Sequence, residues 1–156
     1  MGYGSLVERH RIEIERHEIK LALGERAPAR LRALAMGDFH FDPLYEADYV
    51  ARCVDLANSL QPDVIFLTGD YVTSTSDRIG EFAGLLSKLS PRSGVFACLG
   101  NHDHWSNAAR VSAALKAAGV EVLVNQQTRV SCAAGELVVA GLQSAWGGSS
   151  IGVVPA

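Results

Sequence analysis

Three apolar runs of this chain end in the same way, and this repeated ending restricts the fold more than any other feature of the sequence. The runs cover residues 31–36, 63–68 and 95–99, and each is followed by glycine and a polar residue, giving Gly37-Asp38, Gly69-Asp70 and Gly100-Asn101. The polar residues follow one another at intervals of 32 and 31 residues, a length that suits one strand, one helix and their loops. The sequence therefore predicts two consecutive βαβ units whose strands end at a common edge of a parallel sheet.

The segments between and after these runs predict the remaining elements. Residues 45–60 have a broad apolar stripe at helical spacing, and polar caps and breakers delimit two further helices. We predict helices over residues 45–60, from a cap at Ser76 or Asp77 to Leu89, and from a cap at Ser106 or Asn107 to Ala118, with short strands over 121–124, 128–132 and 137–140. Continuous apolar strands of this kind are typical of a parallel sheet covered on both faces.

The N-terminal part of the chain has a different rhythm. Residues 8–23 alternate charged and aliphatic side chains, which predicts one or two half-exposed strands, as an antiparallel pair or an edge. The predicted fold class is therefore α/β, with a βαβαβ parallel core preceded by an N-terminal strand pair. Repeats, low-complexity tracts and linkers are absent from the sequence. We expect one domain, with N-terminal strands over 1–30, the core over 31–148 and a tail over 149–156.

Composition excludes several classes of function. The net charge of −3 and the pI near 5.9 give no electrostatic basis for binding nucleic acid or an anionic membrane. The three cysteines lack a C-x-x-C spacing and are predicted to be free thiols, which suits a reducing compartment. No run approaches the ~20 apolar residues of a membrane span, and the first 20 residues lack a signal-peptide core. We expect a cytoplasmic chain that is at most peripheral to the membrane.

The predicted sheet edge gathers side chains that can bind metal ions. Asp38 and His40 are two positions apart, so in an extended strand end both can point to one ion. A carboxylate together with an imidazole suits Mn, Fe, Co or Zn better than Ca or Mg. Asp70 has two oxygens and could bridge two ions, while Asn101 offers a neutral amide oxygen. The sequence therefore predicts a site for two divalent ions, which would bind a phosphoryl group and activate a water.

His102 and Asp103 are the predicted catalytic residues. His102 directly follows a predicted ligand, and a histidine held by a carboxylate is suited to stabilise a phosphoryl oxyanion or to protonate a leaving group. A lone D-x-H or G-D is weak evidence, since an aspartate after a strand is ordinary turn chemistry. Three such endings in order, each after a predicted buried strand, are far more specific.

These motifs resemble those of the calcineurin-like metallophosphoesterases. The order D-x-H, G-D, G-N-H-D, in the contexts LRALAMGDFHF, PDVIFLTGDYV, GVFACLGNHDHW and GVEVLVNQ, is most similar to the bacterial YkuE-like branch. The resemblance implies a four-layer αββα sandwich and a dinuclear site that hydrolyses a phosphomonoester, phosphodiester or pyrophosphate bond. It implies that Asp38 and His40 bind the first ion, that Asp70 bridges and that Asn101 binds the second. His102 would be the catalytic histidine, with Asp103 orienting it.

The same resemblance also shows what this sequence lacks. The family continues with a lone metal-binding histidine and a Gly-His-x-His motif, whereas the five histidines here end at His104. The chain is therefore expected to be a C-terminally truncated domain, and self-association could cover its incomplete sheet. The resemblance suggests a small-molecule or lipid-linked phosphoester substrate, such as a UDP-linked acylated sugar.

Two alternatives to a phosphoesterase remain open. The first is a catalytically incomplete relative that acts as a weak metal-binding or interaction module. The second is a small α/β nucleotide-binding protein, although the sequence has no glycine-rich phosphate loop.

Overall fold

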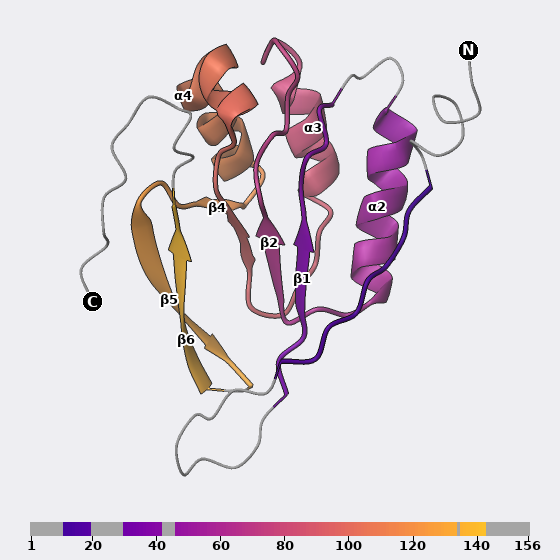
Figure 1. Cartoon of the computed structure of the whole chain (residues 1–156), viewed down its shortest axis with the longest axis vertical. Coiled ribbons are helices and arrows are strands. Elements are labelled where there is room, and N and C mark those ends of the chain that lie inside the picture. Colours follow the sequence, from indigo (N-terminus) through magenta and orange to yellow (C-terminus); the bar gives the residue numbers. More distant parts are fainter. Residues whose placement is uncertain (1–10, 20–29, 42–45, 134, 143–156) are drawn as a thin grey trace.

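The computed structural model describes residues 11–19, 30–41, 46–133 and 135–142. Four strands form a parallel sheet in the order β1-β2-β3-β4. They are β1 (Ala33–Met36), β2 (Val64–Leu67), β3 (Val95–Ala97) and β4 (Glu121–Val122). Helices α2 (Ala47–Ser59), α3 (Ile79–Leu86) and α4 (Asn101–Ala117) connect consecutive strands, as Figure 1 shows. The predicted α/β class and its βαβαβ core are confirmed.

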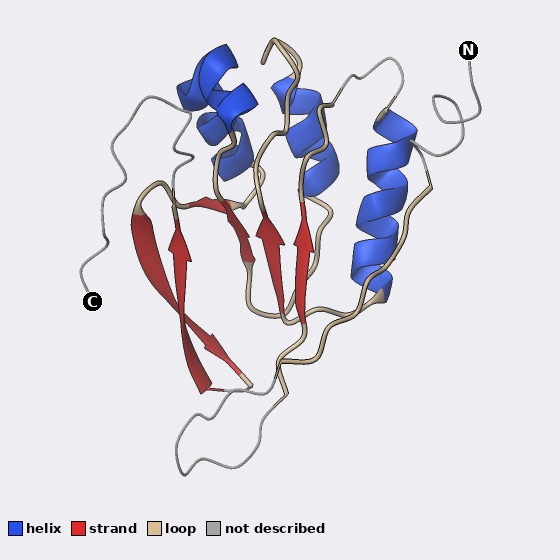
Figure 2. Ribbon diagram, in the orientation of Figure 1, coloured by secondary structure: helices blue, strands red, loops and turns tan. Residues whose placement is uncertain are grey.

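One face of the sheet carries the three helices that the structure describes. Alternate strand residues such as Ile65 and Leu67 share a buried core with side chains from each helix, including Val54, Phe82 and Leu115. Because neighbouring residues of a strand point to opposite faces, the strands present their remaining side chains to the second face. Helices α2, α3 and α4 therefore form a layer on one face, which Figure 2 shows beside the sheet.

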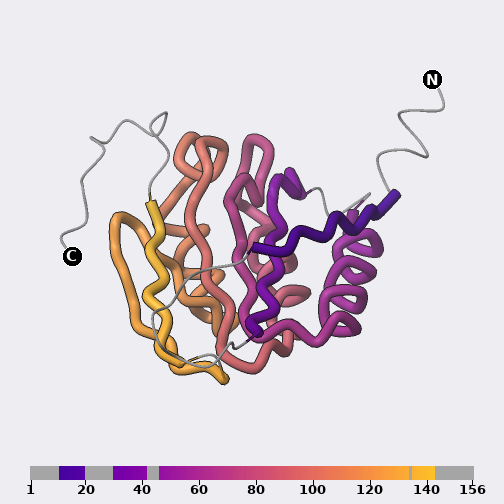
Figure 3. The backbone as a smooth tube through the Cα atoms, turned by 60° about the horizontal axis from the view of Figure 1, so that its bottom comes forward, coloured from indigo at the N-terminus to yellow at the C-terminus, as the bar shows by residue number. Residues whose placement is uncertain are grey.

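An antiparallel hairpin covers part of the second face. Strands β5 (Gln126–Cys132) and β6 (Gly135–Gly141) pair along their whole length. Val130 and Val139 of the hairpin pack against a second buried cluster that includes Val64 and Phe96 of the parallel sheet. Figure 3 shows the hairpin beside the β4 end of the parallel sheet, away from β1. Helices, parallel sheet and hairpin are thus three of the layers that the αββα prediction requires.

The cover over the second face is incomplete at β1. Ala33 and Ala35 are exposed there, and Phe66 of β2 is only half-buried. The expectation of a sheet covered on both faces therefore holds near the hairpin and is wrong at β1, for the part of the chain that the structure describes.

Three other predictions need correction. Residues 11–19 are described and belong to no strand, so the predicted N-terminal strands are wrong there, while 8–10 and 20–23 lie outside the described residues. Helix α3 is preceded by Arg78 as its cap, not by Ser76 or Asp77. Helix α4 begins at Asn101 and is interrupted at Asn107, whose φ is −163°. The Asn107 side chain accepts a hydrogen bond from the Arg110 N–H, so it caps the second part of this helix as predicted.

Candidate metal centre

Three potential metal ligands meet at the carboxyl ends of β1 and β2. Asp38 and His40 lie on the loop after β1, Asp70 lies on the loop after β2, and their ligand atoms are all within 4.8 Å of one another. We call these three residues the ligand cluster. The His40 Nε2 and Asp38 Oδ1 atoms are 2.8 Å apart, and the Asp38 side chain is 80% exposed. The ligand cluster is therefore preassembled and open to solvent.

The backbone of the ligand cluster adopts left-handed conformations. The φ angles are 60° at Asp38, 45° at His40 and 54° at Asp70, and the other described non-glycine residues with positive φ are Gln61 and Asn125. Backbone hydrogen bonds hold these conformations: Asp38 N–H donates to Gly69 O at 2.9 Å, and His40 N–H donates to Asp70 O at 3.0 Å. Non-glycine residues in this region carry strain, and such strain is concentrated at functional sites.

Close approach of the β2 and β3 ends depends on two glycines. Gly69 has a φ of 101°, and a Cβ there would meet the backbone of Gly100. A Cβ on Gly100 would overlap the carboxylate of Asp70. The repeated glycine of the sequence is thus explained at these positions, because a side chain would displace the backbone of Gly100 in one case and the carboxylate of Asp70 in the other.

Asp103 links the loops of the site through hydrogen bonds of its carboxylate. Its side chain is fully buried and accepts hydrogen bonds from the backbone N–H groups of residues 70, 71, 72 and 100. Burial raises the pKa of Asp103, and these four donors act in the opposite direction. Its hydrogen bonds within the described chain join the first turn of α4 to the β2–α3 loop, and none of them reaches the His102 side chain.

His102 lies beside the ligand cluster. Its backbone N–H donates to Asp70 Oδ1 at 2.9 Å, and its ring is 4.5 Å from the His40 ring, nearly perpendicular to it. The Trp105 ring lies 5.0 Å from the His102 ring, and Trp105 is 64% exposed. Asn101 is the first residue of α4, next to Gly100, which lies against Asp70. The fold therefore brings the predicted catalytic histidine to the same edge as the predicted ligands.

Thr73 is a site residue that sequence reasoning missed. Its carbonyl oxygen is 2.6 Å from His102 Nδ1, and its hydroxyl donates to His40 O at 3.0 Å. Only its place three residues after Asp70 could have pointed to it, because a threonine in a loop has no distinctive pattern.

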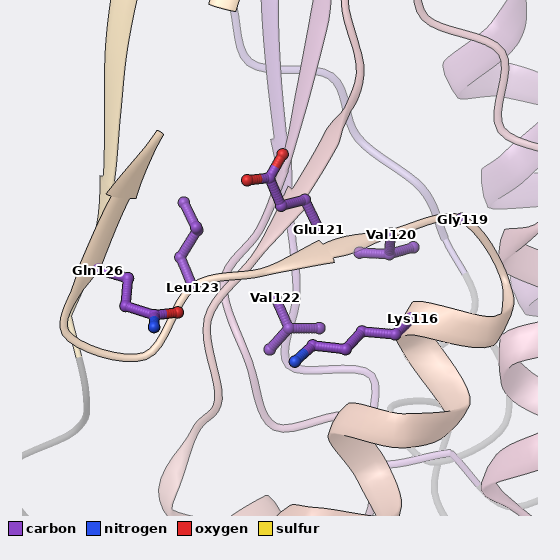
Figure 4. A pocket seen from close by; sticks show the side chains of 7 residues that line it. All are labelled: Lys116, Gly119, Val120, Glu121, Val122, Leu123 and Gln126. Atoms are coloured by element: carbon purple, nitrogen blue, oxygen red, sulfur yellow. The ribbon is translucent and has the colours of Figure 1, made fainter. Parts of the chain in front are cut away.

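A hollow elsewhere on the molecule has no potential metal ligands clustered in it. This hollow, of about 460 Å³, lies where the end of α4 meets β4 and is lined by residues including Lys116, Val122 and Gln126, as Figure 4 shows. The chemistry of the chain is therefore better sought at the ligand cluster.

The donors of the ligand cluster fit a divalent transition-metal ion. Two carboxylates and one imidazole are a mixed oxygen and nitrogen set, which Mn, Fe, Co and Zn accept. In the structure the His40 Nε2 and Asp38 Oδ1 atoms already face each other at 2.8 Å. Preassembly lowers the ordering cost of binding, since the ligands already face one another.

The fold and this site define a class of protein. Residues 31–148 match the family of calcineurin-like phosphoesterases, and the chain belongs to that family. The resemblance inferred from the three motifs is thereby confirmed.

Two bacterial proteins match this chain over most of its length. The chain is 30% identical over 151 residues to the phosphodiesterase YaeI of Escherichia coli (strain K12), covering 94% of this chain and 55% of the relative. It is 26% identical over 149 residues to an uncharacterized metallophosphoesterase of Aquifex aeolicus, with 94% and 55% covered.

A shorter match is to the UDP-2,3-diacylglucosamine pyrophosphatase LpxG of Chlamydia trachomatis. It has 32% identity over 84 residues, covering 51% of this chain and 25% of that protein. This chain thus spans about half the length of the first two relatives. Among the described helices, none has the length and apolar character needed to cross a bilayer.

Proposed function

We propose that the chain provides a metal-dependent phosphoester hydrolase site centred on Asp38, His40 and Asp70. The observation that carries the proposal is the ligand cluster itself, whose atoms lie within 4.8 Å of one another on backbone in strained, left-handed conformations. Family membership supports phosphoester hydrolysis as the class of reaction. The YkuE-like branch and the dinuclear form of the site stay predictions.

Each residue has a proposed role. Asp38, His40 and Asp70 would hold a first divalent ion, Mn, Fe or Zn, and Asp70 and Asn101 would hold a second. When bound, such ions polarise a phosphoryl oxygen and lower the pKa of a water that can attack it. His102 stabilises the charge that develops on the phosphoryl oxygens or gives a proton to the leaving group.

Asp103 has a different proposed role from the one that the family resemblance implied. Because its hydrogen bonds go to the backbone of residues 70–72 and 100, we propose that it is a positioning residue. It fixes the loop that carries Asp70 and the helix turn that carries His102, without touching the reacting atoms.

The proposed substrate is a phosphomonoester, phosphodiester or pyrophosphate. Among these, a lipid-linked compound such as a UDP-linked acylated sugar is supported by the name of the Chlamydia trachomatis relative. Such a substrate would bring a cytoplasmic protein to the membrane surface.

The test is hydrolysis of bis(p-nitrophenyl) phosphate with added Mn²⁺, compared among the wild type, Asp70→Asn and Asp55→Asn. Asp55 is an exposed residue of α2. Asp55→Asn therefore removes the same charge as Asp70→Asn, but at a position outside the site. We expect Asp70→Asn to lose roughly 100-fold or more in rate and Asp55→Asn to stay within about twofold. Equal rates for the wild type and Asp70→Asn would disprove the proposal.

The uncovered sheet face favours a second candidate function, in which the chain is an interaction module. Ala33 and Ala35 are exposed on β1, where a second copy of the chain could pack. Sedimentation velocity would test this: self-association that Ala35→Lys abolishes supports it, while a monomer at all concentrations contradicts it.

A further inference from the structure

We infer that Thr73 is a positioning residue that holds His40 and His102 against each other. Its effect on the reaction rests on the proposed function, but its effect on the geometry does not. Thr73 lies in the loop between β2 and α3, three residues after Asp70, and its backbone and side chain each bond a different histidine.

The contact between Thr73 and His102 fixes which nitrogen of the His102 ring carries the hydrogen. The distance from His102 Nδ1 to Thr73 O is 2.6 Å, and a carbonyl oxygen can only accept a hydrogen bond. Nδ1 must therefore carry the hydrogen, so in the neutral ring Nε2 has the free lone pair. This contact both orients the ring and decides which nitrogen is left for a ligand.

The contact with His40 holds a strained peptide. His40 has a φ of 45°, and its N–H donates to Asp70 O at 3.0 Å. The Thr73 hydroxyl donates to the His40 carbonyl oxygen, also at 3.0 Å. Both polar groups of the His40 backbone are thus held by the β2–α3 loop, which opposes relaxation toward ordinary angles.

The two contacts together explain the packing of the histidine rings. The rings lie 4.5 Å apart at 87°, in the edge-to-face arrangement that aromatic rings favour. Since one residue anchors both partners, a shift of the Thr73 loop would move a predicted metal ligand and the predicted catalytic histidine at once.

The test compares Thr73→Val, which keeps the shape and removes the hydroxyl, with Thr73→Ser, which keeps the hydroxyl. Because Thr73 is exposed, water competes for its hydrogen bonds and the effect should be modest. We expect Thr73→Val to bind Mn²⁺ roughly 3- to 10-fold more weakly by calorimetry and Thr73→Ser to stay within about twofold of the wild type. Equal Mn²⁺ affinity of Thr73→Val and the wild type would overturn the role proposed for the hydroxyl.

A measurement on the metal-free protein is independent of activity and of Mn²⁺ binding. The imidazole ¹⁵N shifts of His102, recorded at mildly alkaline pH, should show hydrogen on Nδ1 in the wild type and in Thr73→Ser. Hydrogen on Nε2 in the wild type would overturn the inference, even if a variant fails to fold.

The two proposals fail in different ways. A wild type that hydrolyses no phosphoester, yet has the Nδ1–H ring and loses Mn²⁺ affinity in Thr73→Val, would refute the hydrolase and support the role of Thr73. An active enzyme with the other tautomer would do the reverse.

Discussion

The ligand cluster and Asp103 lie at the same sheet edge but differ in almost every physical property. The ligand cluster is open to solvent, with Asp38 80% exposed, and its backbone is strained. Asp103 is fully buried, and its oxygens accept four backbone N–H groups. The difference teaches that this edge separates its tasks: Asp103 stabilises the loops, and the ligand cluster is left free to bind. Variants should therefore affect stability at one region and cation binding at the other.

The largest expected effect is that of Asp103→Asn. An amide has one acceptor oxygen, and its NH₂ group would face N–H donors, so buried donors lose their partners. We expect the free energy of unfolding to fall by about 3 kcal/mol, measured by urea denaturation. Asp55→Asn, at an exposed position of α2, is the matched control and should change it by less than ~0.5 kcal/mol. Similar small losses for both variants would show that Asp103 does not stabilise the loops as proposed.

A smaller loss of stability is expected for Tyr71→Phe. This variant tests whether the region that stabilises the loops around Asp103 also includes Tyr71. The buried Tyr71 hydroxyl lies 3.0 Å from Leu67 O and 2.8 Å from Cys98 O, where it links β2 to β3. Burial raises the pKa of this phenol, so the hydroxyl stays a donor at neutral pH. Its removal should cost about 1 kcal/mol in urea denaturation and leave Mn²⁺ affinity unchanged. If Mn²⁺ affinity falls together with stability, stabilisation and cation binding are not separate properties of the two regions.

The smallest effect is a gain in stability, from glycine at two left-handed positions. Asp38 in the ligand cluster and Gln61 after α2 have φ angles of 60° and 50°, and glycine tolerates both. Asp38→Gly and Gln61→Gly should each add roughly 0.5–1 kcal/mol to the free energy of unfolding, measured as a rise in melting temperature.

The two glycine variants should then differ in calorimetry. Asp38→Gly should lose Mn²⁺ binding because it lacks a ligand, while Gln61→Gly should keep it. If Asp38→Gly instead destabilises the protein, the carboxylate contributes to the fold and the comparison between the two regions fails.

Much of the site could be predicted because it depends on topology. Parallel strands joined by helices must end at one edge, so the residues after each Gly could be placed together from spacing alone. The structure brings Asp38, His40 and Asp70 within 4.8 Å of one another, as that reasoning expects. The strands and helices of the core could be predicted from the periodicity of the apolar residues.

The rest depends on contacts that leave no local pattern. Alternation over residues 8–23 predicted strands, but a strand needs a partner, and residues 11–19 pair with none that the structure describes. The sequence predicted that Asp103 orients His102, and only the folded chain shows that its carboxylate binds backbone N–H groups instead. Thr73 acts partly through its carbonyl oxygen, which every residue possesses, so no residue type could have marked it.

The left-handed backbone at Asp38, His40 and Asp70 has a consequence for protein engineering. The recognition geometry is stored in main-chain torsions, so copying the three side chains onto the strand ends of another α/β protein would reproduce the composition of the site without its shape. A successful graft would also have to include the surrounding structure. That structure comprises the glycines that allow the close approach, the buried carboxylate that anchors the loops, and the turn that carries Thr73.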